Sequence, residues 1–146
     1  MNGSNSYQER NSIIHNRGED IFLDYCQTHN LEVHRLGFDE KNAPVREFFH
    51  LSPFIRNLPD FIVTSDKKIT LVNVKGSLNF KQKEFEMLEG FGHLYESEHS
   101  KLYYCFALPN LLQWKSLEGV RDAYIAAGEK NEATWPDGVV YRRLRL

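Results

Sequence analysis

The chain has 146 residues, a length that suits one compact domain with a sizeable core, and we expect a single domain over 1–146. Its 41% apolar and 26% charged residues are ordinary for a globular protein, and its net charge of −2 gives no overall attraction to nucleic acid, although a local basic surface is compatible with that total. No apolar run approaches the roughly 20 residues that span a bilayer, and the polar start lacks a secretion signal. We therefore expect a cytoplasmic protein without membrane contact, in which Cys26 and Cys105 are buried, reduced thiols.

The first half of the chain predicts one helix followed by strands. Apolar residues at helical spacing predict a helix from about Tyr7 to His29, and alternation predicts a strand over Leu31–Phe38. Residues 39–57 are interpreted as an irregular excursion with room for a short strand. Strands over 60–64 and 69–75 then form a hairpin, with residues 65–69 as its turn.

The second half predicts two more helices and two more strands. Asn79 is suited to cap a helix that runs to about Glu98, and Lys101–Leu108 is expected to form a buried strand. A final helix is predicted over Leu111–Ala127, ending near Gly128, before an Asp137-Gly138 turn and a last strand over Val139–Arg145. This order predicts an α/β or α+β fold, in which a central mixed sheet is flanked by helices.

The hairpin carries the residues of greatest chemical interest. Asp60 opens its first strand, and Asn73 and Lys75 lie near the end of its second. Side chains alternate along a strand, so Asn73 and Lys75 point to the same face and can meet Asp60 there. A metal-dependent phosphodiester-cleaving site requires groups of this kind: a carboxylate, an amide oxygen, the Val74 backbone carbonyl and an ammonium. Mg²⁺ prefers oxygen ligands, and a lysine can stabilise developing charge.

Glu19 is the candidate for a second acid. It lies at the margin of the apolar stripe of the first helix, next to Gly18, and from there it can face inward along the sheet. The alternative is that Glu19 and Asp20 begin a solvated face of the helix.

These pieces, Glu19, Pro59-Asp60 and Asn73-Val74-Lys75, resemble the motifs of the PD-(D/E)XK nuclease superfamily over roughly residues 15–98. The resemblance implies a restriction-endonuclease-like αβββαβ core and cleavage of DNA, or less often RNA, with Mg²⁺ or Mn²⁺ as cofactor. It further implies that Asp60 is the primary metal ligand, that Lys75 is the catalytic lysine and that Glu19 assists. Enzymes of this kind that cut both strands usually pair, which implies a homodimer.

Asn73 departs from this pattern, because the superfamily places an acid at that position. An amide oxygen can bind a metal ion but brings no charge, so weaker Mg²⁺ binding is expected. Three interpretations remain open: an active enzyme that tolerates asparagine, a binding-only relative that contacts nucleic acid or a protein, and an inactivating substitution. A further alternative is an unrelated α/β domain in which Asp60 and Lys75 form a structural ion pair.

Basic and polar residues elsewhere are candidates for contact with nucleic acid. Lys81, Gln82 and Lys83 begin the helix that follows the lysine strand, where Gln82 can orient water or bind phosphate; the alternative is that they are only solvated. Arg142 and Arg143, with Arg145, make the C-terminus basic. They can contact phosphates or simply discourage pairing at a strand edge.

Overall fold

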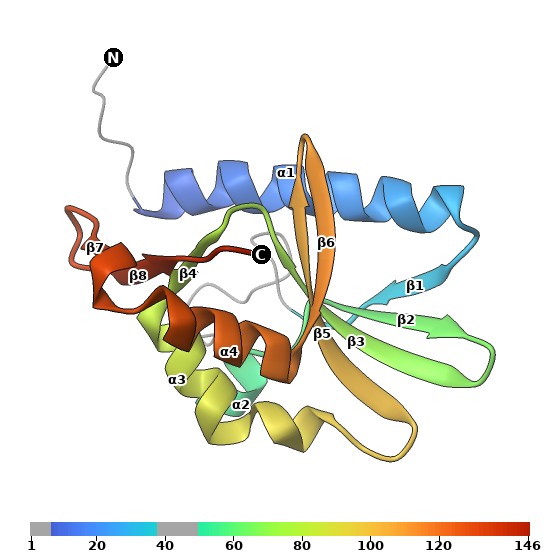
Figure 1. The fold of residues 1–146 in the computed structure, drawn as a ribbon. Coiled ribbons are helices and arrows are strands. Elements are labelled where there is room, and N and C mark those ends of the chain that lie inside the picture. Colours follow the sequence, from blue (N-terminus) through green and yellow to red (C-terminus); the bar gives the residue numbers. More distant parts are fainter. Residues whose placement is uncertain (1–6, 38–49) are drawn as a thin grey trace.

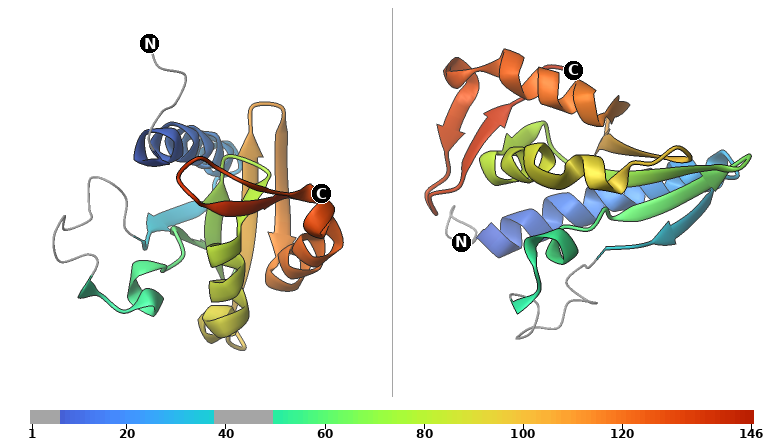
Figure 2. Two further views of the ribbon diagram at one scale, coloured as in Figure 1. Left: turned by 90° about the vertical axis from the view of Figure 1, so that its left-hand side faces the viewer. Right: turned by 90° about the horizontal axis from the view of Figure 1, so that it is seen from below.

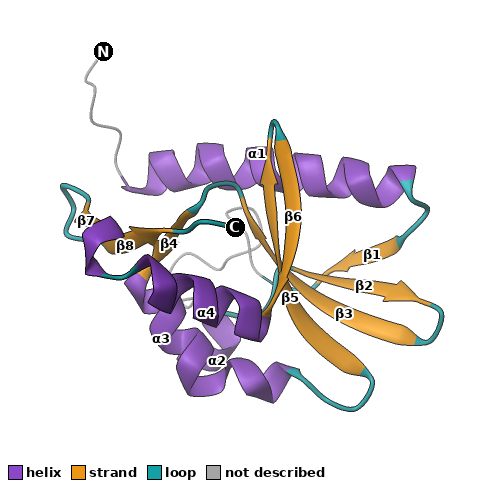
Figure 3. Ribbon diagram, viewed as in Figure 1, coloured by secondary structure: helices purple, strands orange, loops and turns teal. Residues whose placement is uncertain are grey.

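The computed structural model describes residues 7–37 and 50–146, with side chains from residue 17 onward. Its centre is a five-stranded sheet in the order β1-β2-β3-β5-β6 (Figures 1 and 3). The first three strands form an antiparallel meander, β5 runs parallel to β3, and β6 returns antiparallel to β5. The strands are β1 Glu32–Arg35, β2 Phe61–Ser65, β3 Lys68–Lys75, β5 Ser100–Leu108 and β6 Leu111–Ser116.

Helices cover both faces of this sheet (Figure 2). α1 (Tyr7–Thr28) packs on one face, where Phe22 and Cys26 meet Val72 and Cys105. The other face is covered by α3 (Gln82–Phe91) and α4 (Leu117–Ala127), around a core that includes Phe80, Leu102, Phe106 and Val120. The predicted mixed sheet with flanking helices is therefore confirmed, and so is the order αβββαβ, through α1, β1, β2, β3, α3 and β5.

A second, three-stranded sheet lies beside α3 and α4, in the order β4-β8-β7 (Figure 1). Its strands are β4 Asn79–Lys81, β7 Glu132–Thr134 and β8 Val140–Arg143. The remaining elements are short: α2 Pro53–Arg56, η2 Gly92–Tyr95 and η3 Glu129–Asn131.

Several predicted elements agree with the structure. The first helix, the hairpin, the strand that became β5 and the last strand are all present. The hairpin turn is shorter than predicted, because Ser65 pairs with Lys68 and only Asp66 and Lys67 connect the strands. Both connecting residues have positive φ (47° and 66°), which matches the twist of a two-residue hairpin loop.

Two helices begin later in the structure than the sequence predicted. Residues 79–81 form β4, so Asn79 does not cap α3, and Lys81 is its N-cap residue. Residues 111–116 form β6, and α4 begins only after Ser116, whose hydroxyl accepts a hydrogen bond from the Gly119 N–H at 3.0 Å. Both segments are strands because they pair with neighbours, β8 and β5, which local apolar spacing does not reveal.

Other differences are smaller. The strand predicted over Leu31–Phe38 is confined to β1, and β7 was not predicted. Of the excursion at 39–57, residues 39–49 lie outside the described part of the chain, and the described remainder holds a short helix, α2, rather than a strand. The Tyr95 hydroxyl fixes α2 by donating to the Phe54 carbonyl at 2.8 Å.

Cys26 and Cys105 are both free and buried, as expected. Burial raises the pKa of Cys105 to about 12, which keeps this thiol protonated near neutral pH. Within the described ranges, no helix is both long enough and apolar enough to cross a membrane.

Gly18 allows α1 to lie directly on the end of β3. A Cβ atom at Gly18 would lie 2.9 Å from the Gly76 Cα and 3.4 Å from the Ala107 carbonyl oxygen. Both neighbours are backbone atoms, so the helix would have to move away from the sheet. We expect Gly18→Ala to lower the free energy of unfolding by about 1–3 kcal/mol in urea titrations.

Gly90 provides a matched control, because it lies inside α3 and its added Cβ would meet nothing within 4 Å. Gly90→Ala is expected to stabilise the protein by up to about 1 kcal/mol, because alanine is the better helix former. Equal effects of the two substitutions would contradict the close packing at Gly18.

Candidate active site

Asp60 is fixed between β1 and β3 just before β2 begins. Its carboxylate accepts a hydrogen bond from the Val74 N–H at 2.8 Å, and its carbonyl accepts from the Leu36 N–H at 2.9 Å. The N–H and C=O of a strand residue point to the same side, so the Val74 carbonyl also faces the side on which Asp60 lies. The predicted neighbourhood of Asp60 and Val74 is therefore present.

Lys75, the last residue of β3, points to the face of the sheet covered by α3. Its ammonium donates to both carboxylate oxygens of Glu84, at 2.6 and 2.7 Å. The two side chains are only 18% and 24% exposed, so water screens this pair less than a surface ion pair. The ammonium also lies 5.4 Å from the centre of the Phe80 ring. The ion pair of Lys75 is thus with Glu84, and the suggested structural pair of Lys75 with Asp60 is not the one the structure shows.

Asn73 lies opposite Tyr104 in the parallel pairing of β3 with β5, so the two side chains are neighbours on the same face of the sheet. Tyr104 is 5% exposed. Burial is the main cause that raises the pKa of the Tyr104 hydroxyl; the negative charges of Glu84 and, to a smaller extent, Asp60 raise it further, while the neighbouring Asn73 side chain lowers it.

Together these residues form one group on the α3 face at the end of β3, which we call the Tyr104 cluster. Its members are Asp60, Asn73, Lys75, Glu84 and Tyr104. Burial also favours the neutral form of Tyr104, so near neutral pH the hydroxyl is a hydrogen-bond donor or acceptor and not a charge.

Glu19 approaches the sheet from the opposite face. It is 4% exposed, so the inward orientation that its spacing predicts is confirmed and the solvated alternative is wrong. Its carboxylate is bound by the Arg35 guanidinium at 2.7 Å, and that guanidinium lies 4.7 Å from the centre of the Phe61 ring, on the α1 face. The role of Glu19 as a metal ligand stays a prediction.

The residues predicted to contact nucleic acid differ in whether they are bound to other parts of the protein or exposed. Arg142 donates to Glu132 at 3.1 Å and to the Tyr124 carbonyl at 3.2 Å, and its guanidinium lies 4.5 Å from the Tyr124 ring centre. Arg142 is thus held within the fold, whereas Arg143 and Lys83 are exposed. Lys81 ends β4 and Gln82 begins α3, so both lie at the entrance to the helix that carries Glu84.

Glu84 and Tyr104 were not predicted as site residues from the sequence. A signal for Glu84 was present, because it lies one helical turn before the buried Leu88 and therefore faces the sheet. Tyr104 lies in a strand with several aromatic residues, and the sequence does not indicate which of them belongs to the site. Only the pairing of β3 with β5 places Tyr104 beside Asn73.

The Tyr104 cluster and the adjacent Val74 backbone provide four candidate oxygen donors for a divalent ion: the carboxylates of Asp60 and Glu84, the Asn73 amide and the Val74 carbonyl. Among the described residues, no three or more His, Cys, Asp or Glu side chains are grouped closely enough to hold a metal ion. A cage built from protein carboxylates alone is therefore not present in this part of the chain. Mg²⁺ does not require one, because it usually binds one or two carboxylates together with waters and substrate phosphate.

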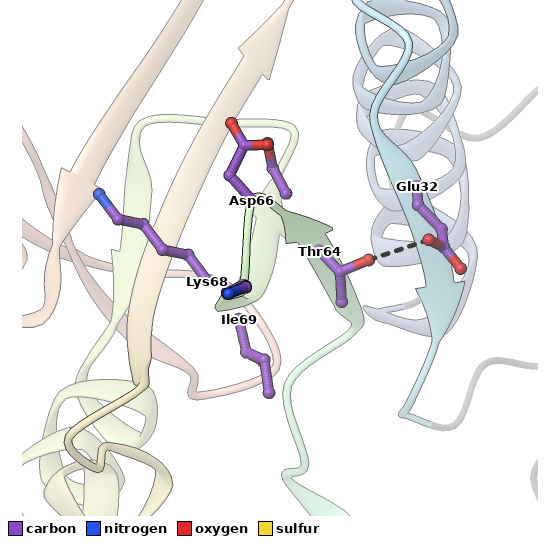
Figure 4. A pocket seen from close by; sticks show the side chains of 7 residues that line it. Glu32, Thr64, Asp66, Lys68 and Ile69 are labelled. Carbon is purple, nitrogen blue, oxygen red and sulfur yellow. Dashed lines mark hydrogen bonds between the residues drawn. The ribbon is translucent and has the colours of Figure 1, made fainter.

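An open pocket lies at the other end of the sheet, around the β2–β3 turn (Figure 4). Its lining includes Glu32, Thr64, Asp66, Lys68 and Ile69, and Glu32 accepts a hydrogen bond from the Thr64 hydroxyl at 3.3 Å. The turn is separated from Lys75 by the whole length of β3, so this pocket is not part of the Tyr104 cluster.

Neither a protein-family model nor a curated protein sequence matches the chain. Among solved structures, the chain is similar to Hjc of Archaeoglobus fulgidus, a Holliday junction resolvase from an archaeal hyperthermophile. The TM-score is 0.45 and the sequence identity 14%, and the match covers 87% of each chain.

Proposed function

We propose that this chain is a metal-dependent endonuclease that hydrolyses phosphodiester bonds of DNA. The observation that carries the proposal is the Tyr104 cluster at the end of β3, in which Lys75 donates to both carboxylate oxygens of Glu84 and the Asp60 carboxylate accepts from the Val74 N–H. Two negative charges, two neutral oxygen donors and one ammonium at the end of a strand are the groups that phosphodiester hydrolysis needs.

In this proposal each residue has a distinct task. Asp60 and Glu84 hold Mg²⁺ or Mn²⁺, with the Asn73 amide and the Val74 carbonyl as neutral donors. The bound ion supplies neutralisation of phosphate charge and a lower pKa for coordinated water. Lys75 donates hydrogen bonds to the attacking water or to a phosphate oxygen, in the position where Glu84 now accepts them.

Glu84 can supply the second acid that is missing at position 73. The missing acid on β3 is matched by a carboxylate from α3, within hydrogen-bonding distance of Lys75. The total charge of the donors is then the same as in a site with two acids on the strands. This favours the active enzyme over the inactivated one, with the Asn73 amide as a neutral donor beside the two acids.

The proposed cleavage reaction implies DNA as the binding partner. DNA is the proposed substrate, with the exposed Lys83 and Arg143 as phosphate contacts. Because one such site cuts one strand, we propose that two copies act together as a homodimer when both strands are cut.

A binding-only nucleic-acid module is the second candidate, and one observation favours it. Both carboxylate oxygens of Glu84 are engaged by Lys75, so the pair satisfies itself without a metal ion or a substrate. An ion pair of this kind can be a purely structural contact between β3 and α3.

Cleavage of supercoiled plasmid and of branched DNA separates the two candidates. We expect nicked or linear products with Mg²⁺ or Mn²⁺ and none when the metal is removed by EDTA, as followed by gel electrophoresis. Retarded but intact DNA under all metal conditions would support the binding module. Neither binding nor cleavage would contradict both.

A further inference from the structure

Arg56, the last residue of α2, has an unsatisfied guanidinium. Its Nε is the only buried side-chain nitrogen or oxygen atom of the described residues that lacks a hydrogen-bond partner. The other half-buried arginine in these ranges, Arg142, donates to Glu132 and to the Tyr124 carbonyl. A buried donor on a charged group costs stability while it has no acceptor, so we expect an acceptor from outside the chain.

The carbonyl groups at the end of α2 are already bound by other donors. The Pro53 carbonyl accepts from the Asn57 N–H at 3.0 Å and from the Asn57 side-chain amide at 2.7 Å. The Tyr95 hydroxyl donates to the Phe54 carbonyl at 2.8 Å and lies 3.4 Å from the Asn57 carbonyl. A basic side chain in the last turn of a helix often caps such carbonyls, but α2 does not need Arg56 for this purpose.

Aromatic contacts fix α2 against the end of α3 (Figure 1). The Phe54 ring stacks on the Tyr95 ring, with centroids 4.8 Å apart and planes inclined by 7°. It also meets the ring of Phe91, the last residue of α3, at 5.7 Å. Burial raises the pKa of Tyr95 to about 12, so near neutral pH its hydroxyl keeps the proton that it donates to α2. Arg56 is therefore carried by a fixed part of the backbone.

Two connections limit the distance between Arg56 and the Tyr104 cluster. Arg56 precedes Asp60 by four residues, and a segment of that length spans at most about 14 Å. The Phe91 ring that holds α2 comes seven residues after Glu84, which is about 10 Å along the helix axis. One DNA strand rises about 3.4 Å per nucleotide, so these lengths correspond to a few nucleotides.

We propose that Arg56 binds a phosphate of the DNA strand a few nucleotides from the phosphate that is cleaved. A guanidinium suits this ligand, because it stays charged and its planar N–H groups can donate to two phosphate oxygens at once. No hydrogen bond or ion pair with another described residue holds the Arg56 side chain, so it can turn toward a phosphate without breaking one. The bound phosphate then supplies the acceptor that Nε lacks. The inference rests on the proposed nuclease function.

Equilibrium binding tests this contact without cleavage. In EDTA, the fluorescence anisotropy of a labelled duplex is expected to show that Arg56→Gln raises the Kd about tenfold and lowers the slope of log K against log salt by about 0.9. Arg121→Gln is the matched control, because it removes the same charge from an exposed arginine that already donates to Glu89 at 2.8 Å. The control is expected to change the Kd by less than about twofold and to keep the wild-type slope.

Uncharged methylphosphonate linkages, introduced one at a time near the cleavage position, identify the phosphate that is bound. At that linkage the wild-type chain is expected to lose about tenfold in affinity, whereas Arg56→Gln should lose no more, because both changes remove the same interaction. In cleavage assays with Mg²⁺, Arg56→Gln should raise KM and leave kcat unchanged, since a flanking phosphate is bound equally in the ground state and the transition state.

Arg56→Met separates the phosphate contact from a structural role. Methionine carries no unpartnered donor into the position that Nε occupies, so the urea midpoint of unfolding is expected to stay the same or to rise. A lower midpoint together with unchanged DNA affinity would assign Arg56 to the fold and overturn the inference.

Equal Kd values and equal salt slopes of Arg56→Gln and Arg121→Gln would also overturn it. A chain that cleaves DNA and shows this equality would keep the nuclease function and lose the phosphate site alone. A chain whose DNA affinity depends on Arg56 but that never cleaves would keep the phosphate site and lose the nuclease function.

Discussion

Glu84→Gln is expected to lower Mg²⁺-dependent cleavage by about a hundredfold or more. The substitution retains the shape of the side chain and its hydrogen-bonding oxygen, but it removes one of the two negative charges beside Tyr104. A lost fixed charge or donor that stabilises a transition state commonly reduces the rate by about 10²–10³-fold. We expect Mn²⁺ affinity, measured by isothermal titration calorimetry, to fall in parallel.

The position of the second acid can be tested by moving it back to β3. If Glu84 replaces an acid at position 73, the double variant Asn73→Asp with Glu84→Gln should recover part of the lost cleavage and Mn²⁺ affinity. Glu89→Gln is the matched control, because Glu89 lies on the same helix but pairs with Arg121 at 2.8 Å on the exposed side. Full activity of Glu84→Gln, or equal losses in Glu84→Gln and Glu89→Gln, would contradict the assignment.

The sequence was informative where chemistry and local spacing coincide. Asp60 and Asn73-Val74-Lys75 were predicted on adjacent strands, because alternation and turn residues are local signals. The structure has Asn73-Val74-Lys75 on β3 and Asp60 directly before β2, with its carboxylate bound to the Val74 N–H. The burial of Glu19 followed in the same way from its place beside the apolar stripe. These predictions required only contacts within a hairpin or a helix.

The residues that were missed depend on contacts between distant segments. β4 exists because Asn79–Lys81 pairs with residues 141–143 of β8, whereas the isolated segment resembles a helix start. Tyr104 becomes part of the cluster only through the parallel pairing of β3 with β5, which places it opposite Asn73. Arg35 as the partner of Glu19 follows from the placement of β1 beneath α1. No local pattern of residues contains this information.

Lys75→Met is expected to lower cleavage by about 10²–10³-fold while leaving Mn²⁺ binding intact or stronger. Methionine is an unbranched side chain of similar length, but it lacks the ammonium that donates to Glu84 at 2.6 and 2.7 Å and lies 5.4 Å from the Phe80 ring centre. Without that ammonium, the Glu84 carboxylate no longer has to exchange one positive partner for another when the metal ion binds. The loss of activity then comes from the missing donor to water or phosphate.

This opposite response of metal binding and cleavage distinguishes a catalytic lysine from a structural one. If the Lys75–Glu84 pair only fastens α3 to β3, the methionine variant should lose thermal stability and show no separate change in Mn²⁺ affinity. Lys83→Met serves as the control, since Lys83 is exposed one residue before Glu84 and should affect only the salt-dependent affinity for DNA. Unchanged cleavage by Lys75→Met under saturating Mg²⁺ would remove Lys75 from the reaction, because an ammonium that stabilises the transition state cannot be replaced by an apolar chain of the same length.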